Sequence, residues 1–315
     1  MDDFRLIEQE VEYWRDPQIW TERGILKKIE RCGRVAWASE DMEGEGTEDR
    51  FFAMLLEKGH TSVLEHVSVC LTAISSGVVL DPADLREALD TVGSLPYFAV
   101  ETIDANALAV CANLRAWVEA SQRARASRPS SIGGMILADI CHFFGLRFPG
   151  LGVSGPPGRF VEGVERVVSV EIMNSPQTTN LQRAKPSKRF RHFSFHIVTD
   201  RAVANEIVRH RTLSFTQLST RYAAQQPRFV VQAEPAPNKA MYEAICRTGY
   251  NAYMGAVENG ASRQNARAML PLGLATRIVV SGYEPDMRWF VKLRSAKGAH
   301  PLIKRIADGI AEKID

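Results

Sequence analysis

The chain has 315 residues, of which 45% are hydrophobic and 24% charged, as in an ordinary globular protein that can bury a core. Its 39 Lys and Arg side chains nearly balance 37 Asp and Glu side chains, which argues against a nucleic-acid-binding protein, because that class needs a strong basic excess. The acidic N-terminus predicts no secretory signal, and no apolar run is long enough to cross a bilayer, so we expect a cytoplasmic protein without a membrane partner.

The first third of the chain predicts a helix, a turn and a strand. Residues 47–59 have helical spacing, with Thr47 as the expected N-cap and Gly59 in the turn that ends the helix. Ser62 and Glu65 then have the spacing of a capping box. Residues 67–75 alternate between apolar and polar side chains, which predicts a strand.

Residues from about 77 to 190 are interpreted as an insertion within a single domain that covers residues 1–315. Residues 105–126 suggest a helix, and residues 128–159 are rich in Gly, Pro and Ser. The segment 150–155 matches the dinucleotide pattern G-x-G-x-x-G, but Pro156 and Pro157 follow at once and disfavour the helix that such a site needs, so we expect a loop. A basic cluster from Arg183 to Arg191 is interpreted as solvated surface, with phosphate steering or a nucleic-acid patch as alternatives.

The last third predicts further strands and helices. Phe193, Phe195 and Ile197 share one face of a strand at 192–200, and Asp200 can cap a helix at 201–211 with Val203 and Ile207 facing inward. Helices are expected at 238–260, 262–272, 287–294 and 302–314, with a strand at 275–282. These elements predict an α/β (α+β) fold, a twisted sheet with flanking helices.

The stretch from Arg209 to Tyr222 is the strongest functional signal. Arg209, His210 and Arg211 are adjacent, and neighbouring cationic side chains repel one another unless an anion lies among them. On a continuous helix at most two of the three could serve one pocket. Ser219 and Arg221 are two residues apart, which in an extended chain places both on one side. Arginine forks and hydroxyl groups together predict an anion or phosphate pocket.

Arg209-His210-Arg211, seven further residues and then Ser219 match the R-H-R-x7-S signature of flavin-dependent thymidylate synthases, and the chain resembles that family. Residues 59–66 resemble its histidine-containing segment, residues 31–40 the short motif upstream, and residues 266–301 its C-terminal core. The resemblance covers the chain outside the insertion, and even there Cys111 to Trp117 look like a segment of the longer members.

The resemblance implies a homotetramer that binds FAD and dUMP where subunits meet. NADPH would reduce the flavin, and 5,10-methylenetetrahydrofolate would supply the carbon for conversion of dUMP to dTMP. By position, the flavin would be held by His60, Ser62, Arg209, His210 and Arg211. The nucleotide would be held by Glu206, Gln217, Ser219, Arg221, Arg267 and Arg294. The catalytic residues would be Arg294, which would favour the reactive ionisation of the pyrimidine, and His60.

Three departures from the family pattern bear on the substrate. Tyr283-Glu284-Pro285 replaces an Asn-x-Arg motif, which removes two expected contacts unless the insertion's Ala112 to Arg115 replace them. Glu206 stands where many members have glutamine, and its carboxylate would repel phosphate unless it is paired. Ala36 replaces a common serine. The alternatives are another C5 modification of dUMP or dCMP, such as hydroxymethylation, and a non-catalytic nucleotide or nucleic-acid binder.

Neither a metal site nor a cysteine nucleophile is expected. His60 and His66 lie six residues apart without a third ligand at a recognisable spacing. The five cysteines form no C-x-x-C pair, which predicts a reducing compartment and no disulfide framework. Cys70 is expected within an apolar strand, and Cys111 and Cys246 within helices. None of these is the accessible, electropositive setting that activates a thiolate.

Overall fold

The computed structural model describes residues 4–15, 21–75, 77, 79–91, 97–124, 131–149, 168–172, 187–232 and 238–315. The chain divides into two compact units. Unit 1 consists of residues 1–15, 30–44 and 192–315, and unit 2 of residues 16–29 and 45–191, so the boundary runs through helix α1 (Glu22–Trp37). The expected insertion falls within unit 2. That the whole chain works as a single domain stays a prediction.

The main sheet of unit 1 has four antiparallel strands. Their order is β2 (Glu10–Tyr13), β7 (His192–Asp200), β10 (Ala275–Tyr283) and β8 (Ser214–Gln217). Phe195 lies opposite Val280 and Ile197 opposite Ile278, so one face of the sheet is apolar. The alternation read from the sequence is confirmed here, because paired residues on neighbouring strands point to the same side.

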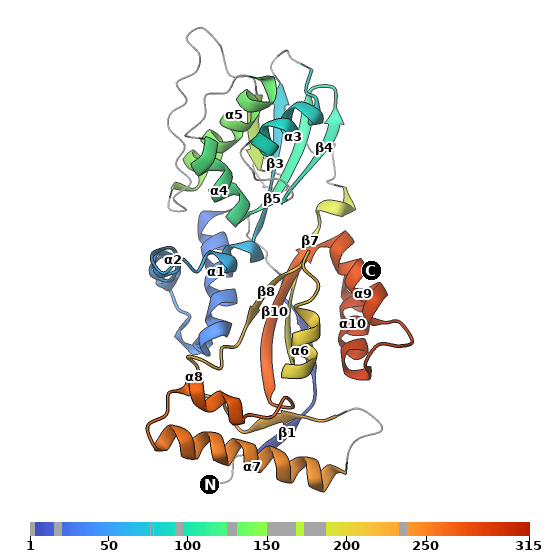
Figure 1. The fold of residues 1–315 in the computed structure, drawn as a ribbon. Coiled ribbons are helices and arrows are strands. Elements are labelled where there is room, and N and C mark those ends of the chain that lie inside the picture. The colour runs from blue at the N-terminus through green and yellow to red at the C-terminus, as the bar shows by residue number, and fades with distance from the viewer. Residues whose placement is uncertain are drawn as a thin grey trace. The chain divides into compact units, whose positions relative to one another are not determined.

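Three helices cover this apolar face: α6 (Arg201–Ile207), α9 (Glu284–Arg294) and α10 (Pro301–Ile314). Figure 1 shows α9 and α10 side by side along the sheet. Val203 and Ile207 of α6 are buried in the same core as Phe290 of α9 and Ile306 of α10. Burial of large apolar side chains of this kind stabilises the fold by roughly 1.5–3 kcal/mol each.

A smaller part of unit 1 is built on two parallel strands, β1 (Arg5–Ile7) and β9 (Arg228–Val230). Phe229, Cys246 and Leu274 form its core. The long helix α7 (Lys239–Glu258), the short α8 (Arg263–Ala266) and the 3-10 turn η5 (Arg267–Met269) belong to this region. Another 3-10 turn, η1, spans Glu40–Met42.

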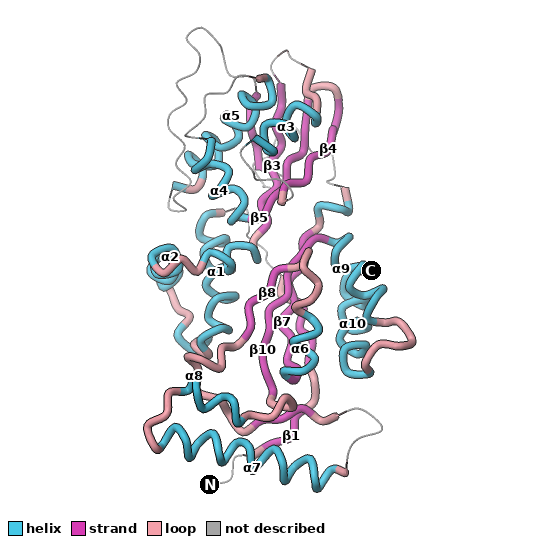
Figure 2. Tube along the Cα trace, viewed as in Figure 1, coloured by secondary structure: helices cyan, strands magenta, loops and turns pink. Residues whose placement is uncertain are grey.

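Unit 2 contains a second antiparallel sheet, ordered β4 (Phe98–Asp104), β5 (Ala107–Asn113), β3 (Ser68–Ser75) and β6 (Val168–Ile172). Its helices are α2 (Thr47–Glu57), α3 (Pro82–Thr91), α4 (Leu114–Ala124) and α5 (Ile132–Arg147), and its 3-10 turns are η2 (Thr61–His66) and η4 (Lys188–Phe190). Figure 2 shows α3, α4 and α5 gathered around this sheet. Trp117 of α4 packs against α5 and the sheet, since its ring stacks on Phe144 of α5 and meets Phe98 of β4 edge-on.

The expected helix at 105–126 is wrong in its first half. Residues 107–113 form β5, and α4 begins only at Leu114. The strand lies between two neighbours and is buried on both faces, so its side chains form an unbroken apolar run instead of alternating. Such a run cannot be distinguished from a buried helix by periodicity alone.

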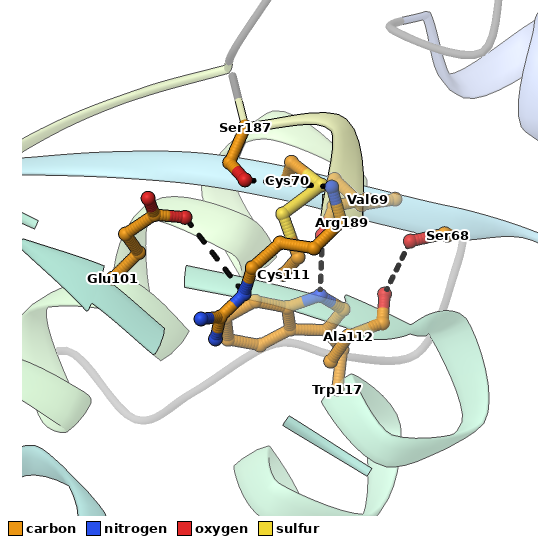
Figure 3. The surroundings of a disulfide bond; sticks show 9 residues. All are labelled: Ser68, Val69, Cys70, Glu101, Cys111, Ala112, Trp117, Ser187 and Arg189. Carbon is orange, nitrogen blue, oxygen red and sulfur yellow. Dashed lines mark hydrogen bonds and ion pairs between the residues drawn. A yellow bond between two sulfur atoms is a disulfide. The ribbon is translucent and has the colours of Figure 1, made fainter. Parts of the chain in front are cut away.

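The expectation of no disulfide is also wrong. Cys70 of β3 and Cys111 of β5 lie directly opposite each other, with Cα atoms 4.1 Å apart, and are disulfide-bonded. Figure 3 shows this bond among Trp117, whose Nε1 donates to the carbonyl of Val69, and Arg189, whose guanidinium pairs with Glu101. Once residues 107–113 are assigned to a helix, the cross-strand pairing of the two cysteines cannot be foreseen.

Several local expectations can be compared with the structure. Asp200 caps α6 by accepting a hydrogen bond from the backbone N–H of Val203 at 2.7 Å, as predicted, and Gly59 ends α2 with a φ of +67°. Thr47 is not a side-chain cap, because Gly46 occupies the N-cap position. The glycine pattern at 150–155, with Arg183 and Lys185 of the basic cluster, lies outside the described residues. Where the structure describes the chain, no helix is long and apolar enough to cross a membrane.

Candidate functional site

The end of α6 determines where the Arg-His-Arg triplet lies. The helix ends at Ile207, and the backbone N–H groups of Arg209 and His210 bond to the carbonyls of Glu206 and Ile207 in a tightening turn. The predicted helix was therefore too long by one turn. Because the triplet follows the helix, its three side chains are not spaced 100° apart on a helical surface. Arg209 and Arg211 are exposed, and His210 is half-buried.

Arg294, the last residue of α9, meets this turn. Its Nε donates to Nε2 of His210 at 2.8 Å, its Nη1 to Oε2 of Glu206 at 2.9 Å, and its Nη2 to the carbonyl of Glu206 at 3.0 Å. The Arg294 side chain is 22% exposed and that of Glu206 is 42% exposed. Two segments more than 80 residues apart thus form one cluster, which we call the Arg294 cluster: Arg294, Glu206 and His210.

The hydrogen bonds of the Arg294 cluster define the protonation of His210. Arginine can only donate, so Nε2 of His210 must be an acceptor, and a neutral imidazole then carries its proton on Nδ1. Burial, and then the positive charge of Arg294, lower the pKa of His210 below its ordinary value. The ring also packs edge-on against Phe290, with centroids 4.7 Å apart. His210 is therefore a fixed, neutral hydrogen-bonding group.

Glu206 is paired with Arg294, so its carboxylate is not the unpaired charge that would repel a phosphate. An unpaired carboxylate here would repel a phosphate, but this one accepts a charge-assisted bond from the guanidinium. The three bonds to Glu206 and His210 engage three of the five N–H donors of an arginine, so two donors remain outside these bonds.

A second group of predicted residues lies around α8 and η5. Ser219 to Tyr222 form a turn in which Oγ of Ser219 accepts from the backbone N–H of Arg221 at 3.1 Å, so the argument for an extended chain does not apply to this segment. Nε of Arg221 donates to Gln264 of α8 at 2.9 Å, and α8 leads directly into Arg267. The structure thus links Arg221 through α8 to Arg267, and both arginines are exposed.

Gln217 and Arg201 are two further polar residues of unit 1. Gln217, in β8, donates to Oγ1 of Thr276 at 3.3 Å. Arg201 is a residue that the sequence analysis missed. Its Nη1 is buried, and among the described residues this atom has no hydrogen-bond partner. Burial, and then the charge of Arg267, lower the pKa of Arg201. The available signal was a basic residue directly after the Asp200 cap, where a helix start favours acidic side chains.

His60 and Ser62 belong to unit 2. The capping box expected at Ser62 and Glu65 is wrong, because residues 61–66 form the 3-10 turn η2 and the Glu65 carboxylate pairs with Arg115 of α4 at 2.7 Å. Ser62 is exposed and His60 is half-buried. That they join Arg209, His210 and Arg211 in one flavin site stays a prediction.

The segment that replaces Asn-x-Arg begins helix α9. Tyr283 is its N-cap residue, and the carboxylate of the buried Glu284 accepts from Nε of Arg288 at 2.8 Å. Arg288 also bonds to Asp315 at 2.7 Å. Arg115, suggested as a substitute from the insertion, is engaged by Glu65 and by Glu119 at 2.8 Å.

The cysteines are poorly suited to nucleophilic catalysis. Cys70 and Cys111 are joined in the disulfide, and Cys32, Cys141 and Cys246 are buried. Burial raises the pKa of Cys141 to about 11 and raises that of Cys246. A thiol with a raised pKa is protonated near neutral pH and is a weak nucleophile. Within the described residues, no three His, Cys, Asp or Glu side chains are grouped to hold a metal ion.

Comparisons with known proteins find a family model that is similar to the C-terminal part of the chain. Residues 181–315 match the family model described as thymidylate synthase complementing protein. A flavin-dependent thymidylate synthase from Thermus thermophilus is 30% identical over 137 residues, which are 38% of this chain and 51% of that protein. One from Thermotoga neapolitana is 30% identical over 143 residues, 42% of this chain and 66% of that protein. The chain thus spans about half to two thirds of the length of these relatives.

A solved structure titled as a UMP/dUMP methylase PolB from Streptomyces cacaoi, bound with 5-Br UMP, aligns with 39% of this chain and 68% of that chain. The identity is 18% and the TM-score 0.35, which does not establish a common fold. The described helices and sheets define a mixed helix-and-sheet protein, which confirms the predicted fold class. Residues 181–315, less than half of the chain, are thus similar to the thymidylate synthase complementing protein family.

Proposed function

We propose that this protein transfers a one-carbon unit to C5 of dUMP, giving dTMP, with FAD as cofactor, NADPH as reductant and 5,10-methylenetetrahydrofolate as carbon donor. The observation that carries the proposal is the Arg294 cluster, in which the arginine near the C-terminus bonds to the histidine of the triplet at 2.8 Å. The relatives named flavin-dependent thymidylate synthase support the same activity.

The exposed arginines of the triplet fit a flavin. In the described chain, the guanidinium groups of Arg209 and Arg211 form no ion pair, so their donors can face an anionic ligand. Together with His210, and with His60 and Ser62 of unit 2, they would hold FAD. When bound and reduced, the flavin supplies hydride for the reaction.

The Arg294 cluster would act on the pyrimidine. Glu206 and His210 fix the guanidinium, and its two remaining N–H donors would point to a ligand. A fixed cation beside a pyrimidine lowers the pKa of the ring's N–H, which favours the anionic, more reactive form. Neutral His210 keeps a proton on Nδ1 and could donate it to a ligand. Glu206 and Gln217 would be neighbours of the nucleotide.

The turn at Ser219 and Arg221, with Arg267, would hold the phosphate. Guanidinium forks bind phosphate oxygens in pairs, and the charge-assisted bonds are worth roughly 1.5–3 kcal/mol each. Removal of Arg221 should therefore weaken dUMP binding at least about tenfold and leave FAD bound, since the triplet is elsewhere in the chain. Equal affinity of the parent and Arg221→Ala for dUMP would refute this assignment.

The proposed homotetramer would complete the sites where subunits meet. Light scattering after size-exclusion chromatography should give four times the 35.1 kDa mass of one chain. A monomer that turns over dUMP would contradict the proposed assembly without affecting the chemistry.

The visible spectrum of the purified protein tests the function. We expect flavin absorbance that survives desalting after incubation with FAD, and a change in that absorbance when dUMP is added. FAD should also raise the unfolding temperature, because a ligand that binds only the folded protein stabilises it. Protein that retains no flavin and is not stabilised by FAD would refute the proposal.

A further inference from the structure

Arg201 has a buried hydrogen-bond donor that no described residue satisfies. Its Nη1 is buried, and no acceptor for this atom exists among the residues that the structure describes. A buried hydrogen-bond donor without an acceptor destabilises the folded protein, so buried polar and charged groups are normally paired or bound to an ion. Arg201 nevertheless lies at the start of α6, where its backbone N–H is held by the carbonyls of Leu272 and Leu274 at 3.0 and 3.1 Å.

The carboxylate adjacent in sequence, Asp200, forms no ion pair with Arg201 among the described residues. Asp200 caps α6 through Oδ1, which accepts from Val203 at 2.7 Å. Its Oδ2 accepts from Nε2 of Gln232 at 3.1 Å. Both oxygens of Asp200 are therefore engaged elsewhere, and no ion pair of Arg201 occurs in the described part of the chain.

A second arginine lies close to Arg201. The segment from η5 to β10 folds compactly, with the N–H of Leu270 bonded to the carbonyl of Arg267 and that of Leu274 to Pro271. This segment starts at Arg267 and ends where Leu272 and Leu274 hold the backbone of Arg201. The charge of Arg267 is near enough to lower the pKa of Arg201. Two neighbouring guanidinium groups repel each other unless an anion lies between them.

Arg221 borders the same segment from its other end. Its Nε donates to Gln264 of α8, three residues before Arg267, where η5 begins. Arg201 and Arg221 therefore both bond to residues 263–274, the segment that contains Arg267, although the three arginines come from separate parts of the sequence.

We propose that Arg201 is a third arginine of the phosphate site, and that its buried Nη1 and Arg267 together bind the phosphate monoester of the nucleotide. This inference rests on the proposed function, to which it adds a residue outside the Arg-His-Arg-x7-Ser motif. A phosphate dianion offers several acceptor oxygens, which satisfies a fork that the protein leaves unpaired.

The test compares FAD-loaded parent protein with Arg201→Gln, Arg201→Lys and the control Arg305→Gln, which removes an exposed charge on α10. Calorimetry measures the binding of dUMP and, separately, of inorganic phosphate. We expect Arg201→Gln to weaken both ligands at least about tenfold, since one charge-assisted contact is lost. Arg201→Lys should be intermediate, because lysine keeps the charge but lacks the fork. Arg305→Gln should match the parent.

The possible results separate this inference from the proposed function. If the parent binds dUMP and Arg201→Gln binds it equally well, the inference is wrong and the function stands. If the parent binds phosphate through Arg201 but not dUMP, the anion site stands and the proposed function fails. If Arg201→Gln weakens the binding of inorganic phosphate but not that of dUMP, the assignment of Arg201 to the nucleotide site is wrong. A parent protein that binds neither ligand would also overturn this assignment. If Arg201→Gln does not fold, Arg201→Lys decides, and unchanged affinity there would refute the inference.

Discussion

Arg294 links the end of α9 to α6 and the turn that follows it. Its guanidinium holds the carboxylate and the carbonyl of Glu206 and also Nε2 of His210, with distances between 2.8 and 3.0 Å. A side chain held at three points loses little further conformational freedom when a ligand binds, so it is preorganised. Glu206 and His210 would therefore act on catalysis by positioning Arg294.

The first prediction at the residue scale concerns Glu206. Glu206→Ala should reduce kcat about five- to tenfold, because a partly exposed, charge-assisted contact is worth about 1 kcal/mol. Glu206→Gln should lose less, since the amide oxygen still accepts from Arg294. Steady-state kinetics with FAD content measured in parallel checks this, and Glu312→Ala, an exposed carboxylate on α10, is the control. A parent-like kcat for Glu206→Ala would contradict the positioning role.

The second prediction concerns His66, which is fully buried in unit 2. Burial, and then the charge of Lys28, lower its pKa to about 3 from 6.5. Below pH 6.5 the unfolded chain binds a proton at His66 that the folded chain resists, so the free energy of unfolding falls as pH decreases towards about 3. His66→Gln should flatten this dependence in denaturant titrations between these two values. An unchanged slope in the variant would show that other groups cause it.

At the scale of elements, the disulfide joins the two central strands of the unit 2 sheet. Cys70 and Cys111 are separated by 41 residues in sequence, and closing a loop of that length should stabilise the fold by about 3–4 kcal/mol. Cys70→Ala with Cys111→Ala should lower the free energy of unfolding accordingly. Thiol titration of the denatured, unreduced parent should detect three of the five cysteines, and five after reduction. Five thiols without reduction would contradict the bond.

The same double variant tests the role of cysteine in catalysis. Because the remaining three cysteines are buried and none is placed in the site, turnover should stay within about tenfold of the parent, less than about 1.4 kcal/mol of barrier. Replacing Cys32, Cys141 and Cys246 as well should not change this outcome if the protein still folds. Loss of turnover in a folded, flavin-loaded cysteine variant would indicate a thiol nucleophile.

The sequence predicts elements well where one face of an element is buried. The alternation at 192–200 and the helical periodicity at 302–314 both correspond to elements of the structure, because each presents one apolar face to the same core. The prediction fails at β5, whose two buried faces remove the alternation. It also extends α6 across the triplet, since the end of that helix has no Gly or Pro to mark it.

At the scale of the whole molecule, the sequence motif indicates which residues form the candidate site. The partners of these residues depend on tertiary packing, which the motif does not describe. The pairing of Glu206 with Arg294 depends on how α9 ends beside α6, which local sequence does not determine. The position of the Arg201 backbone depends in the same way on Leu272 and Leu274, whose carbonyls accept from its N–H. His60 and Ser62 belong to unit 2, and their part in the flavin site rests on the resemblance alone.

The mass of the product formed from dUMP tests the central claim most directly. Purified protein would be incubated with FAD, NADPH, 5,10-methylenetetrahydrofolate and dUMP, and the nucleotides analysed by mass spectrometry. We expect dTMP, with no product from Arg294→Gln, which should still bind FAD because the triplet is intact. A hydroxymethylated nucleotide would instead identify a different C5 modification. Unchanged dUMP from folded, flavin-loaded parent protein would contradict the proposed function.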